Sequence, residues 1–133
     1  VRAGLGMLDG ALNLLPNSDV CFLGARRDEE TFHPEIYMNT LPDDVDGADV
    51  IVLDPMLATG GSLLHALRVI AASGAGTITA VSVLASPEGV SAIESSGVDG
   101  QLFVGFVDDG LNDSAFIVPG LGDAGDRQFG KIN

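Results

Sequence analysis

The sequence predicts an α/β fold in which a mostly parallel open sheet is flanked by helices. Short runs of aliphatic and β-branched residues alternate with helical patterns from residue 50 to residue 107. Each stretch between two such runs is long enough for a helical crossover, which parallel strands require. A hydrophobic content of 46% and 18 glycines suit a globular chain with many turns. With 133 residues, we expect one domain, 1–133, around a single core.

The chain is expected to open with a helix. Leucines recur at helical spacing before Pro16, at Leu5, Leu8, Leu12 and Leu15. The residues Val1 to Gly4 before them read as the end of a strand that turns into this helix. Because that strand and an initiator methionine are missing, we expect a fragment that lacks its N-terminal region. Arg2 would lie at a strand-to-helix junction, where open α/β sheets place ligands.

The next part of the chain predicts a strand followed by an arm. Residues 20–23 are apolar enough for a strand, which runs into Arg27 and a cluster of acidic residues. The pattern then weakens, with a short strand predicted at 36–38 and turn residues after it. We therefore predict a hairpin arm at about residues 28–48, which closes over a site or packs on a neighbouring subunit.

The stretch from Val50 to Ser62 carries a candidate site. Four apolar residues suit a buried parallel strand, and Asp54 stands where this strand should end. Gly60 and Gly61 then allow a tight turn that points several N–H groups at one place. The start of the following helix adds a partial positive charge, and the hydroxyl of Thr59 is a further donor. These are the parts of a phosphate-ester site, while Asp54 suits a sugar diol or a metal ion.

The elements after this stretch alternate regularly. A helix is expected from Leu63 to Gly74, and a strand over residues 77–84. A second helix is expected over residues 87–96, with Pro87 well placed in its first turn, and a strand over residues 101–107.

The tail from residue 108 is rich in glycine and acidic residues, and we expect it to form a hood at about residues 108–133. Residues 115–118 predict a short strand, and an octapeptide follows at 119–126. Its glycines match G-x-G-x-x-G, but we exclude a dinucleotide fold because that motif must open a strand–helix–strand unit. We predict instead a rigid loop whose backbone N–H and C=O groups bind a flat heterocycle.

Charge and composition narrow the classes of function. The net charge is −13, from 19 acidic and six basic residues, so nucleic-acid binding is not expected. No apolar run reaches membrane-spanning length, and a single cysteine cannot form an internal disulfide, so we expect a cytoplasmic protein without a membrane partner. A polyanionic substrate would have to be held by backbone N–H groups, a few arginines and a divalent metal.

Three motifs carry a resemblance to a known family, namely Arg2-Ala3-Gly4, the loop 54–62 and the octapeptide 119–126. The loop resembles the signature of type I phosphoribosyltransferases, although Pro55 stands where most of them have a second acid. Asp-Pro-Met-x-Ala-Thr-Gly-Gly-Ser and the octapeptide are similar to those of uracil phosphoribosyltransferases. The resemblance implies the type I phosphoribosyltransferase fold, with a hairpin arm and a C-terminal base-binding loop.

The resemblance also implies a site for phosphoribosyl pyrophosphate (PRPP). Two arginines would contact the pyrophosphate, since a guanidinium grips two oxygens at once. Asp54 would fix the ribose hydroxyls, and the end of the loop would hold the 5′-phosphate. The implied PRPP-binding residues are Arg2, Arg27, Asp54, Pro55, Met56, Leu57, Ala58, Thr59, Gly60, Gly61, Ser62 and Asp123. Of these, Asp54, Arg27 and Asp123 would be catalytic through positioning and charge stabilisation.

Uracil would be bound by Gly122, Asp123, Ala124 and the backbone of Ile117. The implied reaction converts uracil and PRPP to UMP and diphosphate, as in pyrimidine salvage. Mg²⁺ is the implied cofactor, held by the substrate and by Asp123 through water. GTP is a candidate effector, and a homo-oligomer of two or more subunits is implied.

Two other functions are kept open. The first is a non-catalytic pyrimidine regulator that senses PRPP or UMP and binds RNA, against which the shortage of basic residues counts. The second is a purine phosphoribosyltransferase, against which the carbonyl-matching tail loop counts.

Overall fold

The computed structural model describes residues 2–27, 34–42 and 45–131. Its centre is a parallel sheet in which β5 (Ile78–Ala85) pairs with β6 (Gln101–Val107) on one side. On the other side, β5 pairs with β3 (Val50–Leu53) and then with the short β4 (Met56–Leu57). The predicted α/β class is therefore confirmed, and β3 and β6 have the predicted bounds.

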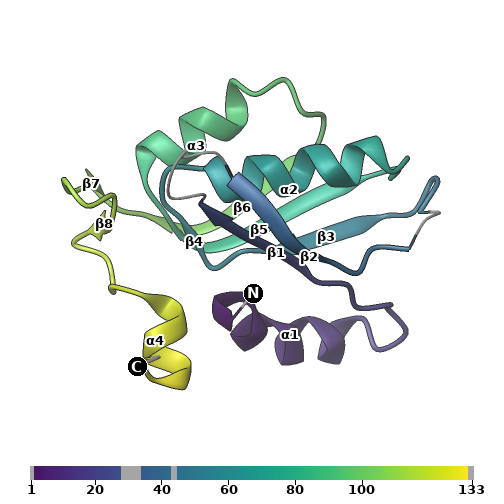
Figure 1. Cartoon of the computed structure of the whole chain (residues 1–133), viewed down its shortest axis with the longest axis horizontal. Helices are drawn as coiled ribbons and strands as arrows, with labels where there is room; N and C mark the ends of the chain where they lie inside the picture. The colour runs from purple at the N-terminus through teal and green to yellow at the C-terminus, as the bar shows by residue number, and fades with distance from the viewer. Residues whose placement is uncertain (1, 28–33, 43–44, 132–133) are drawn as a thin grey trace.

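Helices lie on both faces of this sheet (Figure 1). One face is covered by α2 (Gly61–Ala72) and α3 (Pro87–Glu94), while α1 (Arg2–Leu14) lies against the other. The core sits under α2, because the apolar residues of this helix recur on one side. Its buried members are Leu57, Leu63, Leu67, Ile70, Ile78, Ala80 and Ala85.

The opposite face is only partly covered. There α1 approaches the end of β3, since a Cβ added to Gly4 would lie 3.0 Å from the carbonyl oxygen of Leu53. Farther along the same face, Ile51, Val83 and Phe103 are 46%, 50% and 57% exposed.

The predicted strand at residues 20–23 is wrong in position. The strand is β1 (Leu23–Arg27), and it pairs antiparallel with β2 (Pro34–Asn39) in a separate two-stranded sheet. The two strands approach closely at Gly24, because a Cβ there would lie 2.6 Å from the ring of Tyr37. The predicted strand at 36–38 lies within β2, whereas the tip between β1 and β2 lies outside the described residues.

The tail contains a helix that the sequence pattern did not predict. The strands β7 (Gly110–Leu111) and β8 (Ile117–Val118) form a small antiparallel pair, and α4 (Ala124–Phe129) follows. The octapeptide is thus a loop only as far as Asp123. Asp123 is the N-cap of α4, and its side chain accepts a hydrogen bond from the N–H of Asp126.

No helix in the described part of the chain is long and apolar enough to span a membrane.

Candidate functional site

The acid at the end of β3 is held by the central strand. The N–H of Asp54 donates to the carbonyl of Val81 at 3.1 Å, and the carbonyl of Pro55 accepts from Val83 and Leu84 at 3.1 and 3.0 Å. The chain therefore stays hydrogen-bonded to β5 beyond β3, and the loop leaves the sheet at its carboxyl edge. Parallel α/β sheets place ligands at this edge.

The loop ends in a glycine turn that begins α2. Gly60 is the N-cap, with φ of 81°, and the N–H of Gly61 donates to Oγ1 of Thr59 at 3.5 Å. A Cβ at Gly60 would also lie 3.0 Å from the Cβ of Ala92, so both conformation and space require glycine. The first N–H groups of a helix lack intrahelical partners, and the residues that carry them here line a hollow of about 80 Å³. The hollow is lined by Asp54 and residues 56–63.

The electrostatics of the hollow differ at its two ends. At the helix start, N–H groups and the dipole favour an anion. At the strand end, burial of Asp54 raises the pKa of its carboxyl above 3.8, and a hydrogen bond from the Met56 backbone opposes this rise. The carboxyl is thus poorly solvated, and hydroxyl donors of a ligand would replace the missing water.

A buried serine, Ser86, holds the loop 54–62 in place through hydrogen bonds. Ser86, at 0% exposure, is the N-cap of α3, and its Oγ accepts from the N–H of Gly89 at 3.0 Å. The same Oγ donates to the carbonyl of Ala58 at 2.6 Å, and its N–H donates to the carbonyl of Leu57 at 2.9 Å. Sequence reasoning missed this residue, although a serine before Pro87 is a helix-start signal that could have revealed it.

Replacement of Ser86 by alanine should lower the free energy of unfolding by about 1–3 kcal/mol, because a cap and a buried hydrogen bond are both lost. The affinity of the hollow for a phosphate ester should fall as well. Urea unfolding and a phosphate-ester titration measure the two effects. Ser91→Ala, on the exposed side of the same helix, is the matched control and should change neither by a comparable amount. Equal behaviour of the two variants would contradict this role for Ser86.

The tail lies beside the same edge of the sheet. The N–H of Leu111 donates to Oε1 of Glu88 in α3 at 3.3 Å, and Glu88 is two residues after Ser86. The N–H of Gly120 donates to Oδ2 of Asp108, directly after β6, at 2.8 Å. The hood is thereby tied to α3 and to the end of β6, and Figure 1 shows β7, β8 and α4 beyond the β4 end of the sheet. Asp108 and Glu88 are two further positioning residues that sequence reasoning missed.

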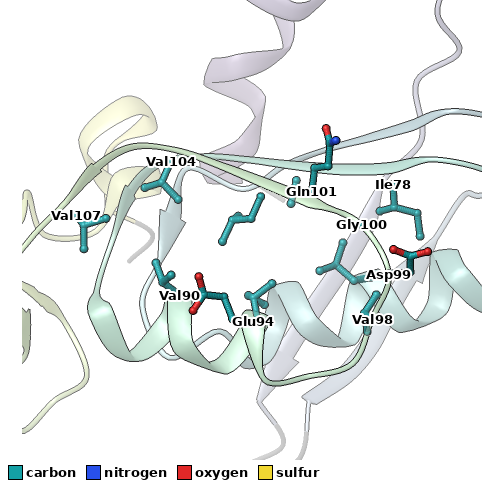
Figure 2. Close-up of a pocket in the computed structure, with 13 residues that line it drawn as sticks. Ile78, Val90, Glu94, Val98, Asp99, Gly100, Gln101, Val104 and Val107 are labelled. Atoms are coloured by element: carbon teal, nitrogen blue, oxygen red, sulfur yellow. The ribbon is translucent and has the colours of Figure 1, made fainter.

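A larger cavity lies elsewhere, between α3 and the sheet (Figure 2). Its volume is about 380 Å³, and its wall is mainly aliphatic, with Val90, Ile93, Leu102 and Val104 among the lining residues. None of the predicted site residues lines it. A phosphate ester needs polar partners, so the smaller hollow at α2 is the better candidate.

Comparison with known proteins shows the family to which the chain belongs. The family model for uracil phosphoribosyltransferase matches residues 1–131. The chain belongs to this family. Uracil phosphoribosyltransferases from Corynebacterium diphtheriae and Corynebacterium efficiens are 52% and 50% identical over the whole chain. The chain covers 63% of the length of each of these relatives.

A solved structure of a protein from Aquifex aeolicus has the same fold, with a TM-score of 0.90 and 48% sequence identity. The match covers 98% of this chain and 62% of that chain.

The structure brings together one part of the predicted PRPP site. Asp54 and residues 56–62 line the same hollow, and Pro55 is buried in the loop between them. Arg2 lies in the first turn of α1, two residues before the glycine that touches the end of β3. The backbone of Arg27 ends β1, and its side chain is not among those that the structure describes.

The predicted uracil residues lie on the tail, in the loop between β8 and α4 and at its two ends. Ile117 is buried in β8, and a Cβ at Gly120 would collide with the carbonyl oxygen of Ile117. Gly122 is in the left-handed region with φ of 77°, and Asp123 and Ala124 begin α4. The carboxylate of Asp123 uses Oδ1 for its cap bond, which leaves its second oxygen for another partner.

The chemistry of this family uses Mg²⁺, so the side chains that are present can be checked for whether they could bind this ion. Among the described residues, no group of three or more His, Cys, Asp or Glu side chains could hold a metal ion. Mg²⁺ keeps several waters and is commonly bound by one or two carboxylates together with substrate phosphates. The residues fit an ion that arrives with the substrate, with the free oxygen of Asp123 or the carboxylate of Asp54 as its protein partner.

Proposed function

We propose that this protein transfers the phosphoribosyl group of PRPP to N1 of uracil, giving UMP and diphosphate. The observation that carries the proposal is the hollow at the start of α2, which is lined by a carboxyl and by a helix N-terminus. Membership of the uracil phosphoribosyltransferase family supports the choice of reaction.

The proposed division of labour follows from the geometry of the hollow. The N–H groups and hydroxyls of residues 58–62 hold the 5′-phosphate, because anions bind where a helix begins. Asp54 accepts hydrogen bonds from the ribose hydroxyls and so fixes the sugar ring. The ring gains positive character in the transition state, and the carboxylate of Asp54 would stabilise that charge.

Arg2 and Arg27 are proposed to neutralise the departing pyrophosphate. When bound, Mg²⁺ would supply further positive charge to the same oxygens. The octapeptide binds uracil through backbone groups from Ile117 and from residues 122–124, and it presents N1 in line with the bond that breaks. Alignment of this kind accounts for a large share of the acceleration in reactions of two substrates.

We also propose that the protein forms a homo-oligomer and that GTP acts as an effector. Their support is the family resemblance, together with a hairpin, β1–β2, that forms a separate sheet.

The experiment that tests the function is UMP formation from uracil and PRPP with Mg²⁺ by the purified chain. We expect turnover with uracil, and none above background with cytosine or hypoxanthine. Absence of UMP with all bases, or preference for hypoxanthine, would overturn the proposal. RNA binding that survives high salt would instead favour the regulator, although a net charge of −13 argues against it.

A further inference from the structure

Two segments at opposite ends of the chain meet where α4 docks on α1. The guanidinium of Arg2 donates through Nη2 to Oδ1 of Asp126 and through Nη1 to the carbonyl of Gly130, both at 2.9 Å. Nε2 of Gln128 donates to the carbonyl of Ala3 at 3.1 Å. The last helix is therefore fixed against the first turn of α1, which also touches the end of β3 at Gly4.

Asp126, in the first turn of α4, is also bonded to the end of the proposed uracil-binding loop. Its N–H donates to Oδ1 of Asp123 at 2.7 Å, which is the bond that starts α4. Gly125 lies between these two acids and packs on the arginine, since a Cβ there would be 3.4 Å from Nη2 of Arg2. Asp126 thus holds Asp123 with its backbone and Arg2 with its side chain.

The ion pair contributes little to stability. The Arg2 and Asp126 side chains are 37% and 31% exposed, so solvent screens most of their attraction. Two bonds from different nitrogens nevertheless fix the plane and direction of the guanidinium. A guanidinium has more N–H donors than these two bonds use, so a bound anion could be gripped without breaking either.

We propose that Asp126 is a positioning residue that orients Arg2 toward the pyrophosphate and couples it to the uracil-binding loop. This inference rests on the proposed function, since it names the two substrates. Asp126 acts through Arg2 and Asp123, so that one residue positions groups of both the pyrophosphate subsite and the uracil subsite. Binding of PRPP would then raise the affinity for uracil, and binding of uracil would raise the affinity for PRPP.

The test compares Asp126→Asn, Arg2→Gln and the double variant with the parent chain. Asp126→Asn should raise the KM for PRPP about tenfold, with a smaller change in kcat, and should raise the KM for uracil less, because the backbone N–H of Asp126 still holds Asp123. In the Arg2→Gln background, the same change should raise the KM for PRPP less than twofold, because the oriented group is already gone. Asp126→Glu, which keeps the charge within reach of Arg2, should recover most of the affinity.

The control is Asp113→Asn, which makes the same charge change at an exposed position of the hood. It should leave both KM values within twofold of the parent. Circular dichroism melts of each variant establish that the fold is kept, and Asp126→Ser, which also removes the charge, takes the place of Asp126→Asn if that variant does not fold.

The outcomes separate this inference from the proposed function. If the parent chain makes no UMP, the proposed function fails, and titration with pyrophosphate and Mg²⁺ still compares parent and Asp126→Asn. If the parent turns over but Asp126→Asn behaves like Asp113→Asn, the inference alone is overturned. A lower KM for PRPP in Asp126→Asn would also overturn it, because the carboxylate would then compete with pyrophosphate for Arg2.

Discussion

Asp54→Asn is expected to remove most of the UMP-forming activity and, at neutral pH, to raise the melting temperature. The activity is lost because hydrogen bonds from two ribose hydroxyls to a charged acceptor, each worth about 1.5–3 kcal/mol, are weakened. We expect kcat/KM to fall about 100-fold or more. Stability rises because asparagine can still accept the Met56 N–H bond but brings no poorly solvated charge.

The pH dependence has a definite sign. Burial raises the pKa of Asp54 in the folded protein above 3.8, so between the two values the folded state binds more protons than the unfolded state. Stability due to this group therefore falls as pH rises through the folded-state pKa, and the loss persists above it. The advantage of Asp54→Asn should grow as pH rises from 3.8 to the folded-state pKa, stay constant above that pKa, and disappear below pH 3.8.

Melting curves of the parent and Asp54→Asn across this pH range measure the effect, and steady-state UMP formation measures the activity. Asp113→Asn serves again as the matched control, since it removes the same charge from an exposed position. A variant with parental activity, or one that melts lower than the parent at neutral pH, would show that Asp54 is not the desolvated ribose ligand described here.

Gly89→Ala is expected to distort the hollow at the start of α2, because Gly89 packs against the loop that lines it. A Cβ at Gly89 would collide with the carbonyl oxygen of Ala58 and lie 2.7 Å from that of Leu57. Both are backbone atoms of the loop, so α3 or the loop must move. We expect a loss of about 1–3 kcal/mol in the free energy of unfolding. The KM for PRPP should rise at least tenfold, because the N–H groups at the start of α2 would no longer point at one place.

Gly10→Ala is the matched control for this change. Gly10 lies in the exposed part of α1, and a Cβ there meets nothing within 4 Å. Alanine should stabilise that helix by about 0.5–1 kcal/mol without affecting PRPP. Urea unfolding and PRPP kinetics measure both variants. If Gly89→Ala bound PRPP as tightly as Gly10→Ala, the hollow would not depend on the close contact between α3 and the loop.

The sequence predicted the elements whose signal is local. The apolar runs of β3 and β6 and the periodic leucines of α2 need only their own residues to be recognised, and the loop from Asp54 to Ser62 lies between two of them. The strand at residues 20–23 was wrong because the true strand, β1, is chosen by its partner β2. Antiparallel pairing selects residues by what lies across from them, which the local pattern does not contain.

The supporting contacts of the site could not be predicted in the same way. Ser86 reaches Ala58 across 28 residues, and Asp108 reaches Gly120 across 12. Their roles depend on how α3 and the hood are placed after folding. The helix α4 is a different case, because Asp123 followed by Asp126 three residues later is a helix-start pattern. Its glycine-rich surroundings favoured the interpretation as a loop.

The contact between Arg2 and Asp126 spans 124 residues, and this separation governs when the pair can form. In an unfolded chain, closing a loop of that length costs roughly 4 kcal/mol of entropy, more than an exposed ion pair returns. The rest of the fold must therefore assemble before the two ends are held together. During synthesis on the ribosome, residues 54–62 emerge well before residues 124–129, so the hollow at the start of α2 can form before α4 docks on α1.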